Sequence, residues 1–141
     1  MPEFTAISTQ EVTAGQNVVF TETPVKCTTG NVFHREGSGI VTLRGITNQC
    51  RARYRVSFGG NIAVPTGGTA GAISLALAIS GEALPASTAT VTPAAVNEYF
   101  NVSMDTFIDV PRGCCVTVSV KNVNAVPINV QNANMIITRE A

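Results

Sequence analysis

The chain has 141 residues, of which 45% are apolar, so it is long enough for one domain with a sizeable core. Its nine basic and nine acidic residues cancel, and only 13% of the residues are charged. The zero net charge argues against a binder of nucleic acid or of anionic membranes, because both normally carry a basic excess. The small number of charges favours a surface that is partly buried against partner molecules.

The N-terminus does not have the pattern of a secretory signal, which is a basic segment followed by an apolar run. No apolar stretch approaches the roughly 20 residues that a membrane-spanning helix needs. We therefore expect a protein that is made in the cytosol and does not act in a membrane. A component of a virion or of a spore coat, assembled before lysis, fits that origin.

Apolar residues recur along the chain with a period of two, which is typical of half-buried antiparallel strands. The expected strands, in chain order, are residues 17–20, 32–35, 40–44, 50–58, 72–79, 98–104, 106–110, 114–120 and 134–139. Segments rich in glycine, proline and asparagine separate these strands and supply turns. Only residues 93–98 are compatible with a helical turn.

The alternation is clearest in two of these segments. In residues 50–58 the inward set is Cys50, Ala52, Tyr54, Val56 and Phe58. In residues 72–79 one face carries Ile73, Leu75, Leu77 and Ile79, and the other carries Ala72, Ser74, Ala76 and Ala78. We expect the face of small residues to point outward, where it would allow close approach of another surface.

Nine or ten short strands separated by turns predict an all-β fold, an antiparallel β-sandwich of the jelly-roll type. No long linker, charge block or internal repeat divides the chain. We expect a single domain over residues 1–141, with residues 1–11 as an N-terminal arm.

Several motifs follow one another in an order that resembles a known family. They are residues 12–20 (VTAGQNVVF), 53–58 (RYRVSF), 73–77 before the short loop 80–84, 110–113 leading into 116–120, and 132–138 (NANMIIT). Over residues 13–138 this order resembles the tumour-necrosis-factor-like jelly roll shared with the complement globular heads. It is most similar to the bacterial and phage versions that end collagen-like surface and exosporium proteins. The resemblance implies a ten-stranded jelly roll and a tight homotrimer.

The sequence contains no collagen-like Gly-x-y stalk and no anchoring leader. We therefore expect a stand-alone trimer, which resembles phage structural proteins, in particular head-decoration or fibre-associated proteins. Its partner would be a capsid or another virion protein. Two alternatives remain. One is a trimeric domain of a bacterial spore or cell surface. The other is a receptor-binding tip that binds glycans through exposed aromatic side chains; Tyr99, Phe100 and Phe107 are the candidates, although alternation places Phe100 in the core.

Arg51, Arg53 and Arg55 share one face of an expected strand and form the main charge asymmetry of the sequence. They are interpreted either as a solvated outer face or as a basic stripe that pairs with acidic groups of a neighbouring subunit or capsid. The remaining candidates for contacts with partners are Ile73, Leu75, Cys115, Met135 and Ile137.

No catalytic apparatus is evident, and we expect neither an enzyme nor a cofactor. His34 is the only histidine, and no Gly-x-Ser-x-Gly motif accompanies it. A zinc site from Cys27, His34, Cys50 and one of the paired cysteines would lack a close-spaced ligand pair. Two aspartates four residues apart, Asp105 and Asp109, are weak evidence for calcium. We therefore expect no metal site.

The four cysteines, Cys27, Cys50, Cys114 and Cys115, allow three pairings with two bridges, and the sequence does not choose among them. In a cytosolic product we expect free thiols that are mostly buried. Alternation places Cys114 in the core and Cys115 on the opposite face. Three Cys115 thiols would approach one another if that face lay at a trimer axis; the alternative is a packed thiol at a sandwich edge.

Overall fold

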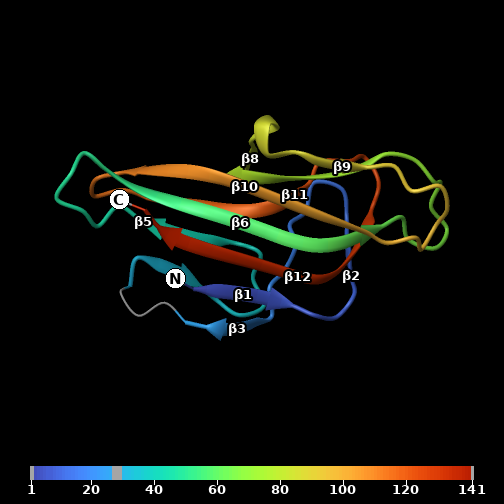
Figure 1. The fold of residues 1–141 in the computed structure, drawn as a ribbon, viewed down its shortest axis with the longest axis horizontal. Helices are drawn as coiled ribbons and strands as arrows, with labels where there is room; N and C mark the ends of the chain where they lie inside the picture. The colour runs from blue at the N-terminus through green and yellow to red at the C-terminus, as the bar shows by residue number, and fades with distance from the viewer. Residues whose placement is uncertain (1, 27–29, 141) are drawn as a thin grey trace.

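The computed structural model describes residues 2–26 and 30–140. Within these ranges twelve strands form two antiparallel sheets, which pack face to face as a β-sandwich (Figure 1). The described residues include a single turn of 3-10 helix and no helix long and apolar enough to cross a membrane. The all-β jelly-roll class expected from the sequence is confirmed.

The first sheet contains both ends of the chain. Its strand order is β10 (Phe100–Pro111), β6 (Arg51–Ala63), β12 (Ile128–Arg139), β1 (Glu3–Ala6) and β3 (Glu22–Val25), and β2 (Gln10–Val12) also pairs with β12. The pairing of β10 with β6 is continuous from Phe100 opposite Ile62 to Pro111 opposite Arg51. Residues 1–11, expected as an arm, therefore contribute β1 and most of β2 to this sheet.

The second sheet has the order β4 (Val32–His34), β5 (Val41–Arg44), β11 (Cys115–Asn122), β7 (Ile73–Ile79) and β8 (Glu82–Ala83). A further strand, β9 (Ala89–Val91), also pairs with β7. The 3-10 turn η1 (Pro85–Ser87) lies between β8 and β9 in the sequence. The Oγ of Ser87 accepts a hydrogen bond from the Leu77 backbone N–H at 3.0 Å, which holds this turn against β7.

Several expected elements differ from the structure. Residues 17–20 form only isolated bridges at Asn17 and Phe20. Residues 100–104 and 106–110 belong to one strand, β10, because Asp105 continues the pairing with β6, opposite Ser57, and its carboxylate points out of the sheet and binds Arg55. Residues 93–98 form bends and a turn rather than a helical turn.

The core lies between the two sheets and is filled from both. Tyr54 is fully buried, and its hydroxyl donates to the Arg44 carbonyl at 2.6 Å, so the phenol keeps a hydrogen bond inside the core. The inward sets expected for Ala52 to Phe58 and for Ile73 to Leu77 are confirmed by their burial. Full burial of one large aliphatic side chain is worth about 1.5–3 kcal/mol.

The outward-facing alanines of β7 are not available to a partner. Ala76 and Ala78 are 1% and 0% exposed, because other parts of the same chain cover them. On β11, Lys121 lies beside Ala76 and Ser119 beside Ala78, and β8 pairs along the other side of β7. The expectation that this face invites another surface is therefore wrong at Ala76 and Ala78, whereas Ala72 is exposed and Ser74 half-buried.

A buried amide fixes the loop between β11 and β12. Asn122 is fully buried, and its Nδ2 donates to the carbonyls of Val12 and Val126 at 3.0 Å each. Its Oδ1 accepts from the backbone N–H of Asn124 at 2.9 Å. Because every polar atom of this side chain is bonded, a buried polar residue is tolerated here and positions the loop.

Candidate interaction surface

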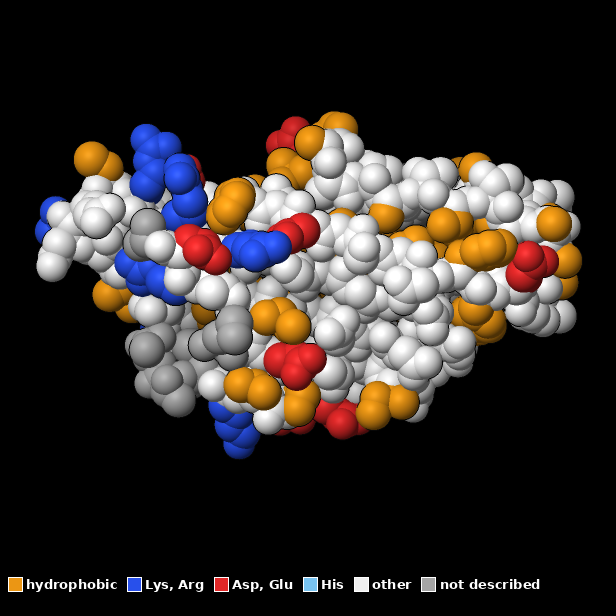
Figure 2. Space-filling view, in the orientation of Figure 1, with side chains coloured by type: hydrophobic (Ala, Val, Ile, Leu, Met, Phe, Trp, Pro, Cys, Tyr) orange, Lys and Arg blue, Asp and Glu red, His pale blue; other side chains and the backbone are white. Residues whose placement is uncertain are grey.

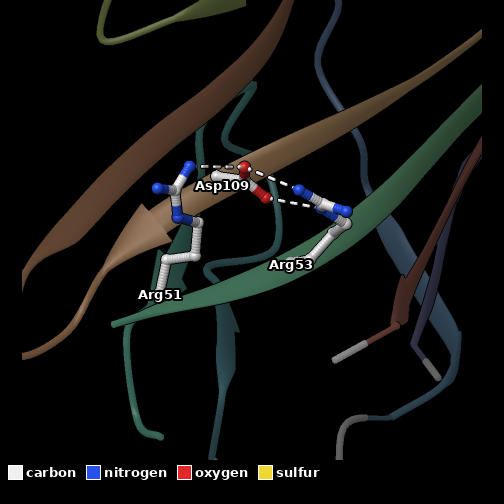
Figure 3. Close-up of polar contacts among 3 residues, drawn as sticks. All are labelled: Arg51, Arg53 and Asp109. Carbon is white, nitrogen blue, oxygen red and sulfur yellow. Dashed lines mark hydrogen bonds and ion pairs between the residues drawn. The ribbon is translucent and has the colours of Figure 1, made fainter. Parts of the chain in front are cut away.

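The three arginines of the expected stripe lie on the outward face of β6, where they meet two aspartates of the neighbouring strand β10. Arg53 binds Asp109 through two bonds, Nε to Oδ1 at 2.8 Å and Nη2 to Oδ2 at 3.1 Å (Figure 3). Arg51 reaches the same carboxylate at 3.3 Å from the other side. The antiparallel register produces this arrangement, because it places Asp109 directly opposite Arg53 and diagonal to Arg51.

Asp105, the second aspartate on β10, binds an arginine of β6 in a similar way. Arg55 binds Asp105 with its Nε, 2.9 Å from Oδ2, and with its Nη2. Ser57, which lies directly opposite Asp105, donates its hydroxyl to Oδ1 at 3.1 Å. We call these six residues, Arg51, Arg53, Arg55, Ser57, Asp105 and Asp109, the arginine ladder.

The ladder keeps its charged groups ionised. The hydrogen bonds from Arg53 are the main cause that holds the pKa of Asp109 below its ordinary value. Those from Arg55 do the same for the pKa of Asp105. The stripe is thus largely neutralised within the chain, a pairing that neither sequence interpretation included. The same contacts engage both aspartates, so they do not form the calcium site considered from the sequence.

Phe107 lies between the two aspartates on the outward face of β10 and opposite Arg55. Its side chain is 61% exposed, and β10 is the edge strand of its sheet. Aromatic side chains are enriched at protein interfaces, so the exposed ring between two paired aspartates is a candidate anchor residue. Figure 2 shows hydrophobic side chains beside the charged groups in this region.

Beyond the ladder, the same face of β10, β6 and β12 is polar but uncharged. Asn101, Asn61 and Gln131 form one row across the three strands, and Asn101 Nδ2 donates to Asn61 Oδ1 at 3.1 Å. The next row is Ser103, Gly59 and Asn134. Figure 2 shows the corresponding broad area without charged side chains. Together with the ladder and Phe107, these rows form what we call the open face.

The edge of the first sheet opposite β10, formed by β1 and β3, carries two carboxylates. Glu3 of β1 lies opposite Ile136, and its Oε2 accepts a hydrogen bond from Asn134 Nδ2 at 3.3 Å. Glu22 of β3 is exposed at the edge of the sheet. The sheet therefore has a basic stripe with its own counter-ions near one edge and two carboxylates near the other.

Four residues expected to contact partners lie in the core of the single chain. Ile73 is 2% exposed, and Leu75, Met135 and Ile137 are each fully buried. Their side chains point between the two sheets, so they are not part of any surface. For Ile73 and Leu75 the alternation along residues 72–79 had indicated a common face, and this face is the one that packs against the other sheet.

The described cysteines are exposed, contrary to expectation. Cys50, Cys114 and Cys115 are free thiols at the surface, and Cys27 lies outside the described residues. Cys114 follows the turn after Pro111 and precedes β11, which begins at Cys115. The alternation of side chains along β11 therefore does not extend to Cys114. Cys115 lies in the second sheet, beside Arg44, and is not part of the open face.

His34 has a packing role in the structure. Its Nε2 donates to the Ser38 carbonyl at 2.7 Å, and its ring packs against Phe4 and Phe20 at centroid distances of 4.5 and 6.3 Å. The described residues contain no cluster of three or more side chains placed to bind a metal ion. The imidazole thus contributes to the core near β1 and β4.

No protein-family model and no curated protein matches the chain. Among solved structures, it is similar to the globular domain of zebrafish complement 1qA protein, with a TM-score of 0.53 and 10% identity over 96% of this chain and 94% of that one. The C-terminal domain of the sugar-binding protein EclA gives a TM-score of 0.42 and 17% identity over 94% of this chain and 80% of that one. A β-glucosidase from Paenibacillus barengoltzii gives 0.36 and 13%, over 70% of this chain and 9% of that one.

The likeness to the complement domain shows a shared fold, an antiparallel jelly-roll sandwich. The other two scores are too low to carry an argument.

Proposed function

We propose that this protein is a non-enzymatic assembly domain that forms a homotrimer through its open face and decorates a larger particle. The observation that carries the proposal is the open face itself, which combines an exposed Phe107, paired charges and uncharged polar rows on one side of the first sheet. Burial of this face would leave few charges without a partner, because both aspartates of the ladder already bind arginines.

The distribution of charge supports a head-to-tail arrangement of three copies. The edge with Arg55 in one copy would meet the edge with Glu3 and Glu22 in the next. Contacts between two different patches generate a closed ring when the rotation between copies is a third of a turn. Phe107 would lie inside this contact as its apolar anchor.

The mass of the purified protein in solution tests the trimer. Light scattering should give three times the chain mass at both low and high salt, because burial of Phe107 and the uncharged rows does not depend on screening. A monomer under both conditions would overturn the proposed assembly.

As the setting of the trimer we propose a phage virion, with the domain bound outside the head or at a fibre. The support is the resemblance of the sequence to stand-alone jelly rolls of phages. Binding only to the assembled shell would stabilise the particle by linkage. Peptide mass spectrometry of particles purified from a lysate should find the chain in the virion fraction. Its presence only on spores or cell surfaces would replace this setting with the alternative one.

A glycan-binding tip is a second candidate function, and exposed aromatic side chains support it. Phe107 is 61% exposed, Phe100 is 37% exposed, and Tyr99 is half-buried. Sugars commonly stack on such rings through their apolar faces. A glycan array tests this candidate: binding that disappears in Tyr99→Ala would support it, and an array without signal would reject it.

A further inference from the structure

Three exposed thiols gather at one end of the sandwich. The Arg112 backbone N–H donates to the Cys50 carbonyl at 3.0 Å, which brings the turn after β10 against the start of β6. The Gly45 backbone N–H donates to the Cys114 carbonyl at 2.8 Å, which adds the end of β5. We call this region, residues 44–53 and 109–115, the thiol end; its loop 45–50 is the tip at the left of Figure 1. Free cysteines are normally among the most buried residues, so three exposed ones require a reason.

The thiol end is also basic. Its two segments contain four arginines, Arg44, Arg51, Arg53 and Arg112, and a single acidic residue, Asp109. Asp109 is already bound by Arg51 and Arg53. Arg44 and Arg112 are exposed and make no ion pair with another described residue. A negatively charged molecule is therefore attracted to this end, although the whole chain has no net charge.

Cys50 is the best placed of the three thiols. Together with Arg51, Asp109 and Pro111 it lines a hollow of about 350 Å³, large enough for part of a small molecule. The side chain of Arg51 is 62% exposed and uses one bond to Asp109, so it retains N–H groups for an incoming carboxylate. Cys115 lies instead on the second sheet, and Cys114 does not line this hollow.

We propose that Cys50 is a site of thiol–disulfide exchange with an anionic low-molecular-weight disulfide, of which oxidised glutathione is the probe. The Cys50 thiol loses its proton to water, and the thiolate attacks one sulfur of the probe. The S–S bond of the probe breaks, its second half leaves as a thiolate, and a mixed disulfide remains on Cys50. The disulfide is the oxidant, so no other co-reactant is required. The carboxylates of the probe bind the arginines of the thiol end and bring its S–S bond to Cys50.

The test uses the full-length protein with oxidised glutathione, followed by intact-mass spectrometry and peptide mapping. Cys50 should be modified about tenfold faster than Cys114 or Cys115 at low salt, and the preference should shrink at high salt. A neutral disulfide of similar size, bis(2-hydroxyethyl) disulfide, should show no such preference. Equal rates at the three cysteines, or equal rates with the two disulfides, would overturn the proposal.

Arginine variants test whether the positive charge of the thiol end, and not the Cys50 thiol alone, determines the reaction rate. Arg51→Gln alone, and Arg112→Gln alone, should each slow the reaction of Cys50 with oxidised glutathione and leave its reaction with the neutral disulfide unchanged. Lys121→Gln removes one positive charge near the other end of β11 and is the matched control, for which the rate should stay the same. If the rate fell equally in this control, the reaction would depend on the net charge of the whole protein, and a local binding site at Cys50 would be contradicted.

Discussion

The outward faces of the two sheets differ in how much of their surface the chain itself covers. On the second sheet, Ala76 and Ala78 of β7 and Ser119 of β11 are no more than 4% exposed, because the chain covers its own strands there. On the first sheet, the open face has no such cover, and Phe107 is 61% exposed. Small residues therefore mark the face that the chain closes by itself, whereas paired charges, amides and an aromatic ring mark the face left for a partner.

The largest effect should come from placing the same side chain on each face. Ala78→Lys inserts a long charged group where no space exists, and we expect a loss of about 3 kcal/mol or more in the free energy of unfolding. Ser103→Lys, on the exposed surface of β10, should change the stability of the subunit by no more than about 0.5 kcal/mol. Urea denaturation at low protein concentration measures both. Equal destabilisation would contradict the difference between the faces.

Removing the aromatic anchor should weaken the assembly without unfolding the subunit. For Phe107→Ser we expect a loss of about 2 kcal/mol in trimer stability, which corresponds to a roughly 30-fold change in an equilibrium constant. Light scattering over a dilution series measures this shift. Ile46→Ser, which removes another exposed apolar side chain but lies at the thiol end, is the control and should leave the trimer unchanged.

A smaller effect is expected from two serine hydroxyls that differ in burial. Ser87→Ala leaves the backbone N–H of Leu77 without its buried acceptor, which should lower the unfolding free energy by about 1–2 kcal/mol. Ser57→Ala loses only a solvent-exposed bond to Asp105 and should have an effect close to zero. Thermal unfolding of the two variants at equal concentration compares them directly.

The smallest effect concerns pH. The pKa of Asp105 and that of Asp109 are lowered in the folded state, so each carboxylate favours folding above the ordinary aspartate pKa, and this contribution is lost as pH falls through the folded pKa. Arg53→Gln should move the pKa of Asp109 upward, toward its ordinary value, and leave that of Asp105 nearly unchanged. Carboxyl-carbon NMR titration reads both. An unshifted Asp109 would contradict the assigned bidentate pair.

Local patterns predicted the fold well, and long-range register explains what they missed. Alternation identified β6 and β7 and placed Tyr54 and Leu75 on core-facing sides. It also found the arginine stripe, but the aspartates that neutralise it are about 50 residues away and meet it only through the pairing of β10 with β6. Separate strands were expected on either side of Asp105, whereas in the structure its carboxylate lies on the surface of one continuous strand.

The exposure of the thiols was mispredicted for a related reason. Alternation was extended from Val116 back to Cys114 and from Ala52 back to Cys50, although both cysteines precede the first residue of their strands. The side-chain directions in a turn do not follow the period of a strand. A sequence pattern at the end of a strand therefore does not determine which side chains are buried.

The place of β12 has a consequence for the order in which the chain folds. This last strand lies between β6 and β1 and also pairs with β2, so it joins segments from opposite ends of the sequence. During synthesis, β6 and β1 lack their common neighbour until residues 128–139 have left the ribosome. Until then the half-built sheet exposes two unpaired edges, which makes the nascent chain prone to aggregation and a client for chaperones. Folding of this sheet is therefore completed by its last strand, and removal of only the final strand would separate β6 and β10 from β1 and β3.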